Sequence, residues 1–479
     1  MIAKNTGDKS NKTEKILVSF WLLILLSINS SAVDLLLINN IKNLFIDRYN
    51  FYDFLNNYYL FKNSIFIVLN FIRTVSVFVI FFIAIIWILN IKKKKNFFLI
   101  FFFLFSFWQI VALHIYQIEN ISIDTLESYR LIVSNLSTIF IFYLALYYNN
   151  KKIYKKFIYC LIFFISLIVL FFSLRLINEF LNSDIINLYG SVTLNPESQT
   201  FLQPTPRITG IARMLVIIFY FLFFFCKYLK NNNIKYFFYI LLFFINFLIY
   251  GMQTRTGIVG ILIFGFYYIC IFNEKKIAKL KTICLLIILP VIFWHTLISL
   301  KKNSFIQIDH NESKTLNKIS EIIKDVRIIK DDTSGRTEIW KKSLKIIEEK
   351  KIIWGIGPKA DRKLLTDTSI ENYNLIHSKS RIIYDNNSSN ALIYSYLSGG
   401  IISTFFLILV YYLSVKQIVR GLFKKMITKQ ESLTNFAHIS LIFLILRSVF
   451  ENGFAIFGLD LCIFILCYFV LFKENLSKK

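Results

Sequence analysis

Residues 331–363 read DDTSGRTEIWKKSLKIIEEKKIIWGIGPKADRK, and they belong to a polar stretch, residues 301–388, in a chain that is otherwise mostly apolar. On both sides of this stretch, apolar runs of about 18 residues or more recur, each long enough to cross a bilayer as a helix. Hydrophobic residues make up 56% of the 479 residues. These features predict an all-α polytopic membrane protein with one large polar loop.

The apolar runs predict about twelve membrane-spanning helices. They lie at residues 16–38, 66–90, 96–116, 130–148, 157–177, 209–229, 236–252, 255–272, 282–300, 389–414, 435–451 and 454–472. Residues 1–300 would carry the first nine helices, residues 301–388 the loop, and residues 389–479 the last three. The whole chain is then one membrane domain.

Positive charge is concentrated in short connections between the apolar runs, such as residues 91–95 and 149–156. Residues 230–235, 273–281 and 415–434 are basic as well, whereas residues 117–129 carry three acidic side chains with no Lys or Arg. The positive-inside rule then predicts that both termini are cytoplasmic and that the loop 301–388 lies outside. The net charge of +26 follows this membrane pattern, so we expect the membrane, and not a nucleic acid, as the partner.

Within the loop, residues 337–353 alternate apolar with charged side chains at helical spacing. This pattern is typical of an amphipathic helix on the membrane interface or on the outer face of the domain. Gly355-Ile-Gly-Pro358 follows and would end the helix in a turn.

Neither cysteine nor histidine shows a metal-binding pattern. All six cysteines fall inside apolar runs without a Cys-x-x-Cys pair, so no disulfide framework or zinc site is expected. The five histidines are dispersed, and no Asp-x-Asp sequence occurs. We therefore expect neither a metal nor another cofactor.

Four arginines occupy unusual positions. Arg207 and Arg213 lie where the sixth apolar run begins, Arg255 opens the eighth, and Arg336 opens the loop helix. Each could simply extend to lipid headgroups. Together, at the predicted outer face, they favour a shared anionic ligand, because the guanidinium fork suits bidentate phosphate contacts. A lipid phosphate or pyrophosphate fits this position best.

Five short motifs follow one another along the chain: Pro206-Arg-Ile-Thr-Gly210, Thr254-Arg-Thr-Gly257, Ser334-Gly-Arg-Thr-Glu-Ile-Trp340, Trp354-Gly-Ile-Gly357 and Asn387-Ser-Ser-Asn390 with the following residues to Gly400. In this order they resemble the core of the bacterial O-antigen ligase and O-antigen polymerase superfamily, over about residues 207–400. The resemblance implies a GT-C-like fold in the bacterial inner membrane and a metal-independent, inverting glycosyl transfer at its periplasmic face. The donor would be an oligosaccharide on undecaprenyl pyrophosphate, and the acceptor a lipid-linked glycan or lipid A core.

The resemblance also implies roles for the arginines. Arg207, Arg213, Arg255 and Arg336 would bind the pyrophosphate. Arg336 would be catalytic as well, because preorganised donors stabilise the charge that grows on the leaving group. Trp340, Ser389 and Asn390 would support this site.

In one respect the sequence departs from the family pattern, since Ser389 stands where many members carry His. Another group would then activate the acceptor hydroxyl, and the nearest titratable candidates in sequence are Asp385 and His377. Their other interpretations are a cap of the next helix for Asp385 and a solvated loop residue for His377. The same departure favours a repeat-unit polymerase over a ligase.

A different class of function also fits a chain with twelve spans. A flippase or exporter of lipid-linked oligosaccharides would carry membrane arginines too, but it needs charged groups along a path to both faces. Here the unusual charges gather on the predicted outer side, which favours an enzyme.

Overall fold

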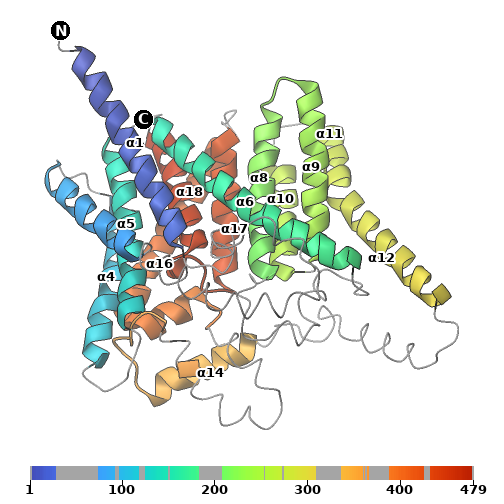
Figure 1. Ribbon diagram of the computed structural model, residues 1–479. Coiled ribbons are helices and arrows are strands. Elements are labelled where there is room, and N and C mark those ends of the chain that lie inside the picture. Colours follow the sequence, from blue (N-terminus) through green and yellow to red (C-terminus); the bar gives the residue numbers. More distant parts are fainter. Residues whose placement is uncertain are drawn as a thin grey trace, which may run out of the picture. The chain divides into compact units, whose positions relative to one another are not determined.

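A computed structural model describes residues 3–28, 74–91, 96–117, 125–148, 151–182, 208–252, 254–271, 275–308, 336–359, 361, 364–365, 388–425 and 432–476. Within these residues every regular element is a helix (Figure 1). The helices are Thr74–Leu89, α1 Ala3–Ser27, α4 Phe97–Gln117, α5 Thr125–Tyr147, α6 Lys151–Asn182, α8 Ile208–Lys227, α9 Asn232–Gly251, α10 Arg255–Ile271, α11 Lys276–Ile283, the π-helical turn η3 Cys284–Ile288, α12 Leu289–Ile308, α14 Arg336–Glu349, α16 Ala391–Lys425, α17 Ser432–Ser448, the 3-10 turn η4 Gly453–Ala455 and α18 Leu459–Leu476.

Seven helical segments of this part of the chain are long and apolar enough to cross a membrane. They are Phe97–Ile115, Ser128–Tyr147, Lys152–Leu170, Gly210–Lys227, Asn232–Gly251, Lys276–Leu297 and Ala391–Phe423. Three shorter helices, Thr74–Leu89, Arg255–Ile271 and Ser432–Ser448, are also apolar. The predicted all-α membrane protein is confirmed, whereas the number of twelve crossings and their orientation stay predictions.

The chain divides into two compact units, and each is described by itself. The first contains residues 1–168, 339–427 and 440–479, and the second contains residues 169–338 and 428–439. Both are therefore built from segments that lie far apart in the sequence.

In the first unit, α16 packs along α4, and small polar groups and aromatic rings fill the contacts. The Ser403 hydroxyl of α16 donates to the Phe105 carbonyl oxygen of α4 at 3.2 Å. Near the start of α4, the ring of Phe98 stacks on Tyr468 of α18, with 3.6 Å between centroids. Ring packing of this kind fills much of the core of the unit.

An ion pair joins the middle of α1 to the second turn of α6. Lys156 Nζ lies 2.6 Å from Glu14 Oε1, and the Glu14 side chain is 7% exposed. The lysine-rich start of α6 therefore lies beside the middle of α1. That the amino terminus and residues 149–156 share the cytoplasmic side stays a prediction.

The helix α16 is broken near its amino-terminal end. Gly399 (φ −139°) and Gly400 (φ 61°, ψ −157°) leave the helical conformation, and the chain then continues as a helix. The left-handed φ of Gly400 is the conformation that favours glycine. A Cβ atom on Gly400 would also overlap the Ile353 carbonyl oxygen, so a second chain segment fills the space at the break.

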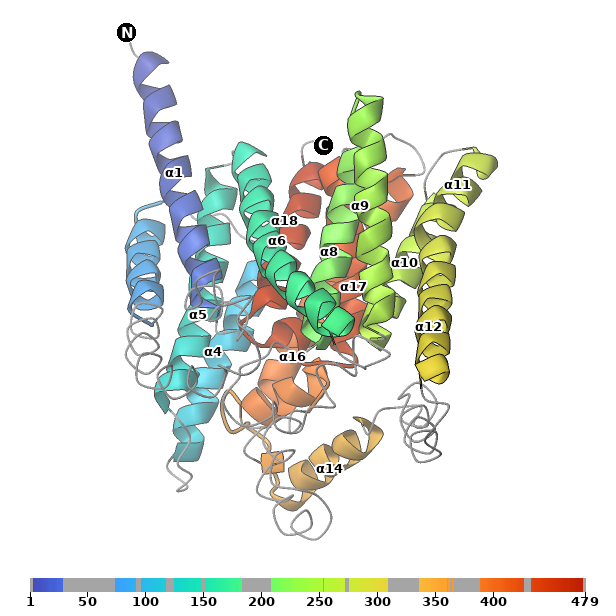
Figure 2. The ribbon, with the colours of Figure 1, turned by 45° about the vertical axis from the view of Figure 1, so that its right-hand side comes forward.

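That segment is the turn after α14. Figures 1 and 2 show that α14 lies across the direction of the long helices α4 and α5. The helix ends at Glu349, four residues before the predicted end at Ile353. It ends there because Lys351 adopts a left-handed φ of 47° and Ile352 N donates to the Ile347 carbonyl oxygen at 3.1 Å, a Schellman motif.

The carboxyl-terminal part of α14 is held by a small apolar core. It consists of buried side chains from the helix, from the following turn, from a short segment after it and from α16: Ile346, Ile352, Ile356, Leu364, Leu365 and Leu397. Partly buried Ile339 and Ile347 pack against this core. Ile339 and Ile347, two apolar residues of the predicted amphipathic helix, thus pack against other parts of the protein.

In the second unit, α8 and α10 run side by side in the same direction. Tyr220 OH of α8 donates to the Gly260 carbonyl oxygen at 2.5 Å, and Phe223 contacts Phe264 with ring centroids 4.6 Å apart. Nearer their ends, Lys227 Nζ donates to Tyr268 OH at 3.2 Å. Since the contacts advance together along both helices, the amino-terminal ends of α8 and α10 lie together.

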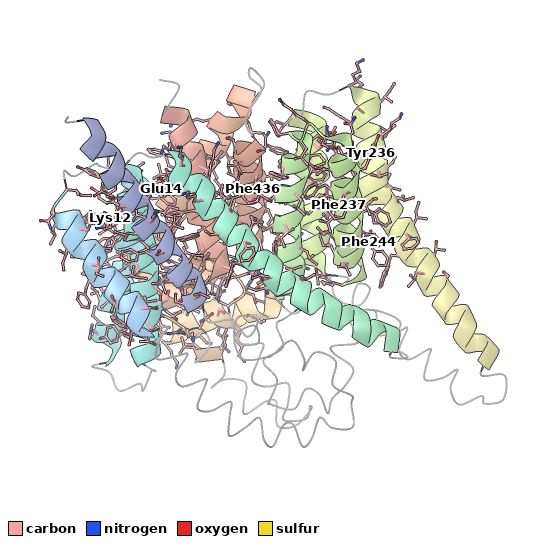
Figure 3. All side chains as sticks on the ribbon, turned by 45° about the horizontal axis from the view of Figure 1, so that its top comes forward. Lys12, Glu14, Tyr236, Phe237, Phe244 and Phe436 are labelled. Atoms are coloured by element: carbon pink, nitrogen blue, oxygen red, sulfur yellow. The ribbon has the colours of Figure 1, made fainter. Side chains whose placement is uncertain are left out.

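On its exposed side, α9 carries large apolar residues. Tyr236, Phe237 and Phe244 are 68%, 62% and 52% exposed and lie along α9 (Figure 3). In a membrane-crossing helix, such a row suits contact with lipid, since lipid tails solvate apolar side chains that water does not.

Candidate functional site

The sequence Thr254-Arg-Thr-Gly257 is the capped beginning of a helix. The Thr254 hydroxyl accepts a hydrogen bond from Gly257 N at 3.2 Å, which satisfies one of the free N–H groups at this end. Arg255 is the first residue of α10 and is half-buried. The cap therefore places a guanidinium at the positive end of a helix dipole.

Gly257 brings α10 close to α8 at this end. A Cβ on Gly257 would lie 3.4 Å from the Ala212 Cβ of α8 and 2.8 Å from an Ile249 methyl group of α9. The next residue of α8, Arg213, is half-buried, and its Nη2 lies 3.9 Å from the position of a Cβ on Gly210. The Arg213 guanidinium thus lies over the first turn of α8.

The amino-terminal ends of α8 and α10 lie together, so two positive helix ends meet there. Arg255 is the first residue of α10, and Arg213 lies over the first turn of α8. Helix amino termini bind phosphates through free N–H groups, and arginine adds bidentate donors. The arrangement is suited to an anion with several oxygen atoms.

Of the other charged residues predicted for the site, the structure describes Arg336. Arg336 is the first residue of α14 and is half-buried. Arg207, His377 and Asp385 lie outside the described residues. The convergence of all four arginines therefore stays a prediction, while Arg213 and Arg255 share one end of the same helix pair.

The three predicted supporting residues lie together in the first unit. Trp340 Nε1 of α14 donates to the Ser389 carbonyl oxygen at 3.3 Å, and the Trp340 ring stacks near Phe450 with 6.3 Å between centroids. Ser389 has a left-handed φ of 46° and is 9% exposed. Its backbone conformation is unusual for a residue other than glycine.

Asn390 caps α16. Its Oδ1 accepts from Leu392 N at 2.8 Å and from Ile393 N at 3.1 Å, and its Nδ2 donates to the Val449 carbonyl oxygen at 2.9 Å. Asp385, for which a cap of this helix was one interpretation, lies outside the described residues, and the cap residue that the structure describes is Asn390. An amide can both accept from the helix and donate to α17–α18, which a carboxylate cannot.

A buried carboxylate accepts hydrogen bonds in the same region, and the sequence did not predict it. Asp361 is 1% exposed, and its Oδ2 accepts from Ser388 N at 3.0 Å, from the Ser388 hydroxyl at 3.2 Å and from Asn452 Nδ2 at 3.0 Å. Asn452 Oδ1 accepts from Asn390 N at 3.2 Å and lies 2.9 Å from the Ser388 hydroxyl, whose single proton it shares with Asp361 Oδ2. These four residues, Asp361, Ser388, Asn390 and Asn452, are called the Asp361 network below.

The Asp361 network joins three chain segments: the part after α14, the start of α16 and the connection between α17 and α18. Oδ1 of Asp361 is buried and has no hydrogen-bond partner among the described residues. The only sequence signal for Asp361 is an acidic residue in a lysine-rich run, three residues before the apolar pair Leu364-Leu365. That pattern is too common to mark a buried carboxylate.

Other candidates have structural partners. His438 Nδ1 lies 3.1 Å from Tyr267 OH in a buried contact, and His114 Nε2 lies 2.6 Å from Tyr129 OH. Arg447, in the last turn of α17, forms a hydrogen-bonded ion pair with Asp460. A search of the described residues finds no group of three His, Cys, Asp or Glu side chains that could hold a metal ion.

Comparison with known protein families finds a match within this chain. Residues 238–408 match the family described as O-antigen ligase, a range that includes Arg255, Arg336, Trp340, Asp361 and Asn390. A search of curated proteins finds no match. The family match confirms the predicted resemblance and indicates a membrane enzyme of the glycosyltransferase type that acts in polysaccharide assembly.

Proposed function

Because the chain belongs to the O-antigen ligase family through residues 238–408, we propose that it transfers an oligosaccharide from undecaprenyl pyrophosphate to an acceptor glycan. The proposed location is the inner membrane of a bacterium, with the reacting groups at the periplasmic face. The observation that carries the proposal is the position of Arg255 at the first residue of α10, within the matched range and at the end of α10 that packs against the start of α8.

The chemistry of the leaving group explains the arginines. When the glycosidic bond to the pyrophosphate breaks, negative charge grows on the phosphate oxygens. Donors held in place before the reaction stabilise that charge without reorganising. Arg213 and Arg255, with Arg207 and Arg336 brought to the same ligand, would supply these donors. Removal of one such donor lowers the rate roughly 10²- to 10³-fold in other enzymes.

An acceptor hydroxyl that attacks the anomeric carbon from the opposite face inverts its configuration, and its proton must pass to a base. Asp385 and His377 remain the proposed bases. No metal takes part in this proposal, since the arginines carry the positive charge. Washing membranes with a chelator should leave transfer unchanged, and loss of transfer that added Mg²⁺ or Mn²⁺ restores would contradict the metal-free mechanism.

Between the two acceptors, we favour a second lipid-linked repeat over lipid A core, which makes the protein a repeat-unit polymerase. The support is the sequence Ser389-Asn-Ala-Leu-Ile-Tyr394 at the start of α16, with serine where many ligases of the family carry histidine.

The glycan profile of a strain lacking the protein tests this proposal. A polymerase predicts lipid A core that bears a single repeat unit. A ligase predicts bare core with polymerised glycan held on undecaprenyl pyrophosphate, and an exporter predicts lipid-linked repeats retained on the cytoplasmic side. The wild-type gene should restore the glycan profile, whereas the Arg255→Ala variant, present at the same protein level, should not. This result would show that the activity depends on Arg255 at the start of α10. An unchanged profile would contradict all three.

The side of the membrane is tested separately. A reporter that is active only outside the cytoplasm, fused after Lys330, should be active. A fusion after Lys276, in a connection predicted to be cytoplasmic, is the matched control and should be inactive.

A further inference from the structure

We propose that the turn at residues 352–357 is inserted into the membrane, with the side chains of Ile353 and Trp354 in contact with lipid acyl chains. The loop 301–388 would then be attached to the bilayer at a defined point. This inference depends on the membrane fold alone and does not rest on the proposed glycosyl transfer.

Three backbone groups of the turn, Ile356 N, Gly357 N and the Ile353 carbonyl oxygen, are paired within the protein. In hydrocarbon, non-helical N–H and C=O groups must be paired within the protein. Ile356 N donates to the Leu397 carbonyl oxygen at 2.9 Å, and Gly357 N to the Ser398 carbonyl oxygen at 2.8 Å. In return, Ile401 N donates to the Ile353 carbonyl oxygen at 3.0 Å. The turn therefore takes up the backbone groups that the break in α16 leaves without helical partners.

The turn packs so closely against α16 and α4 that no side chain fits between them. A Cβ on Gly355 would lie 2.5 Å from the Gly399 Cα, and a Cβ on Gly357 would lie 2.7 Å from a methyl carbon of Leu113. Both glycines have left-handed φ angles, 88° and 105°. The turn is consequently packed directly against α4 and α16.

Contacts with α4 indicate the depth of the turn. The rings of Trp354 and Trp108 lie 6.2 Å apart between centroids. Trp108 belongs to the apolar segment Phe97–Ile115 and comes seven residues before its end. At a rise of 1.5 Å per residue, Trp108 lies about 10 Å inside that end. Residues 353–357 thus lie beside the apolar part of α4.

The side chains of the turn are apolar where they are exposed. Ile353 and Trp354 are 49% and 50% exposed, whereas Ile352 and Ile356 on either side are buried. The exposed pair continues a row on the second segment of α16, formed by Ile401, Phe405 and Ile408, which are 54%, 55% and 49% exposed. Because this row belongs to a helix that can cross the membrane, the same lipid would cover Ile353 and Trp354.

Charge changes abruptly just before the turn. Lys350 and Lys351, at the end of α14, are exposed, and the exposed side of α14 carries Lys341, Lys345 and Glu348. Lysine side chains at the edge of a membrane extend to lipid phosphates. The boundary between headgroups and acyl chains would therefore fall between Lys351 and Ile353.

Spin labels can measure the insertion in the full chain reconstituted into phosphatidylcholine vesicles. The six native cysteines are replaced by alanine, and one label is attached through Ile353→Cys, Trp354→Cys, Phe405→Cys or Leu344→Cys. Leu344 is the matched control, since it is 56% exposed on α14. Labels at 353 and 354 should collide more with oxygen than with a water-soluble nickel complex, as at 405, while the label at 344 should show the reverse.

Two results would overturn the proposal. Preference for the nickel complex at 353 and 354 would place the turn in water, and low access to both reagents would mean that protein covers it. If the cysteine-free chain fails to fold, the native chain is used in vesicles with lipids brominated at acyl carbons 6 and 7. The emission difference between wild type and Trp354→Phe should then lose most of its intensity, and an unquenched difference would exclude insertion.

Discussion

The Asp361 carboxylate holds Ser388 by two hydrogen bonds, from the backbone N at 3.0 Å and from the hydroxyl at 3.2 Å. The two residues are 27 positions apart, so this contact closes the later part of the loop onto the start of α16. Ser389 and Asn390 follow directly, and their conformation depends on where Ser388 is held. The contact thus links a loop residue to Ser389 and Asn390, two of the predicted supporting residues.

Asp361→Ala should strongly reduce glycan transfer and lower stability. The substitution leaves buried donors of Ser388 and Asn452 without an acceptor, at a cost of about 1–3 kcal/mol for each unsatisfied group. Asp361→Asn keeps an acceptor oxygen at the same place and should retain most of the activity. Thermal unfolding in detergent and the glycan profile measure the two effects. Equal loss of activity in both variants, with unchanged stability, would instead indicate that the charge of Asp361 takes part in the reaction.

Gly355→Ala should separate the turn from the broken helix. A Cβ at this position would lie 2.5 Å from the backbone of Gly399 and Gly400, and the left-handed φ of 88° adds strain. The variant should unfold at lower temperature and lose transfer activity. Gly458→Ala is the control, because a Cβ on Gly458 meets no atom within 4 Å. Comparable behaviour of the two variants would contradict the close packing of the turn.

Arg255→Lys should lose most of the activity although it keeps the positive charge. Lysine cannot offer two parallel donors to a phosphate. Arg255→Ala should lower the transfer rate roughly 10²- to 10³-fold, as expected when one transition-state donor is lost. Lys345→Ala, on an exposed lysine of α14, is the control and should leave the rate unchanged. Transfer is measured on purified lipid-linked repeats, so that protein amounts can be matched. A full rate in Arg255→Ala would remove Arg255 from the pyrophosphate site.

Lys351→Gly should stabilise the protein. Lys351 holds the left-handed position of a Schellman motif, where a residue other than glycine costs about 1 kcal/mol. The gain should appear as a higher unfolding temperature in detergent. Lys350→Gly, one residue earlier in the chain, should lower stability instead, because glycine weakens the end of a helix. A destabilised Lys351→Gly variant would mean that the lysine side chain contributes more than the backbone strain costs.

Much of the fold follows from local patterns that the sequence displays directly. A helix overlaps each predicted apolar run, and Gly355 and Gly357 form a turn as expected. Thr254 and Asn390 are recognisable as cap residues because their side chains bond the backbone only two or three residues away. In contrast, the end of α14 at Glu349 depends on Lys351, and no rule of composition places a lysine in a left-handed conformation.

Apolar length and the order of short motifs therefore determined the class of this protein from its sequence: an all-α membrane chain with an O-antigen ligase region. Only the tertiary structure shows that Asp361 is buried against Ser388 and Asn452 and that the turn at Ile353–Gly357 pairs with the backbone at the break in α16. Only the tertiary structure shows, too, that the starts of α8 and α10, which carry Arg213 and Arg255, lie together. The reason is physical. Transfer of a helix into a membrane depends on the sum of its own side chains, whereas burial of a carboxylate or close approach of two backbones depends on partners that are distant in the sequence.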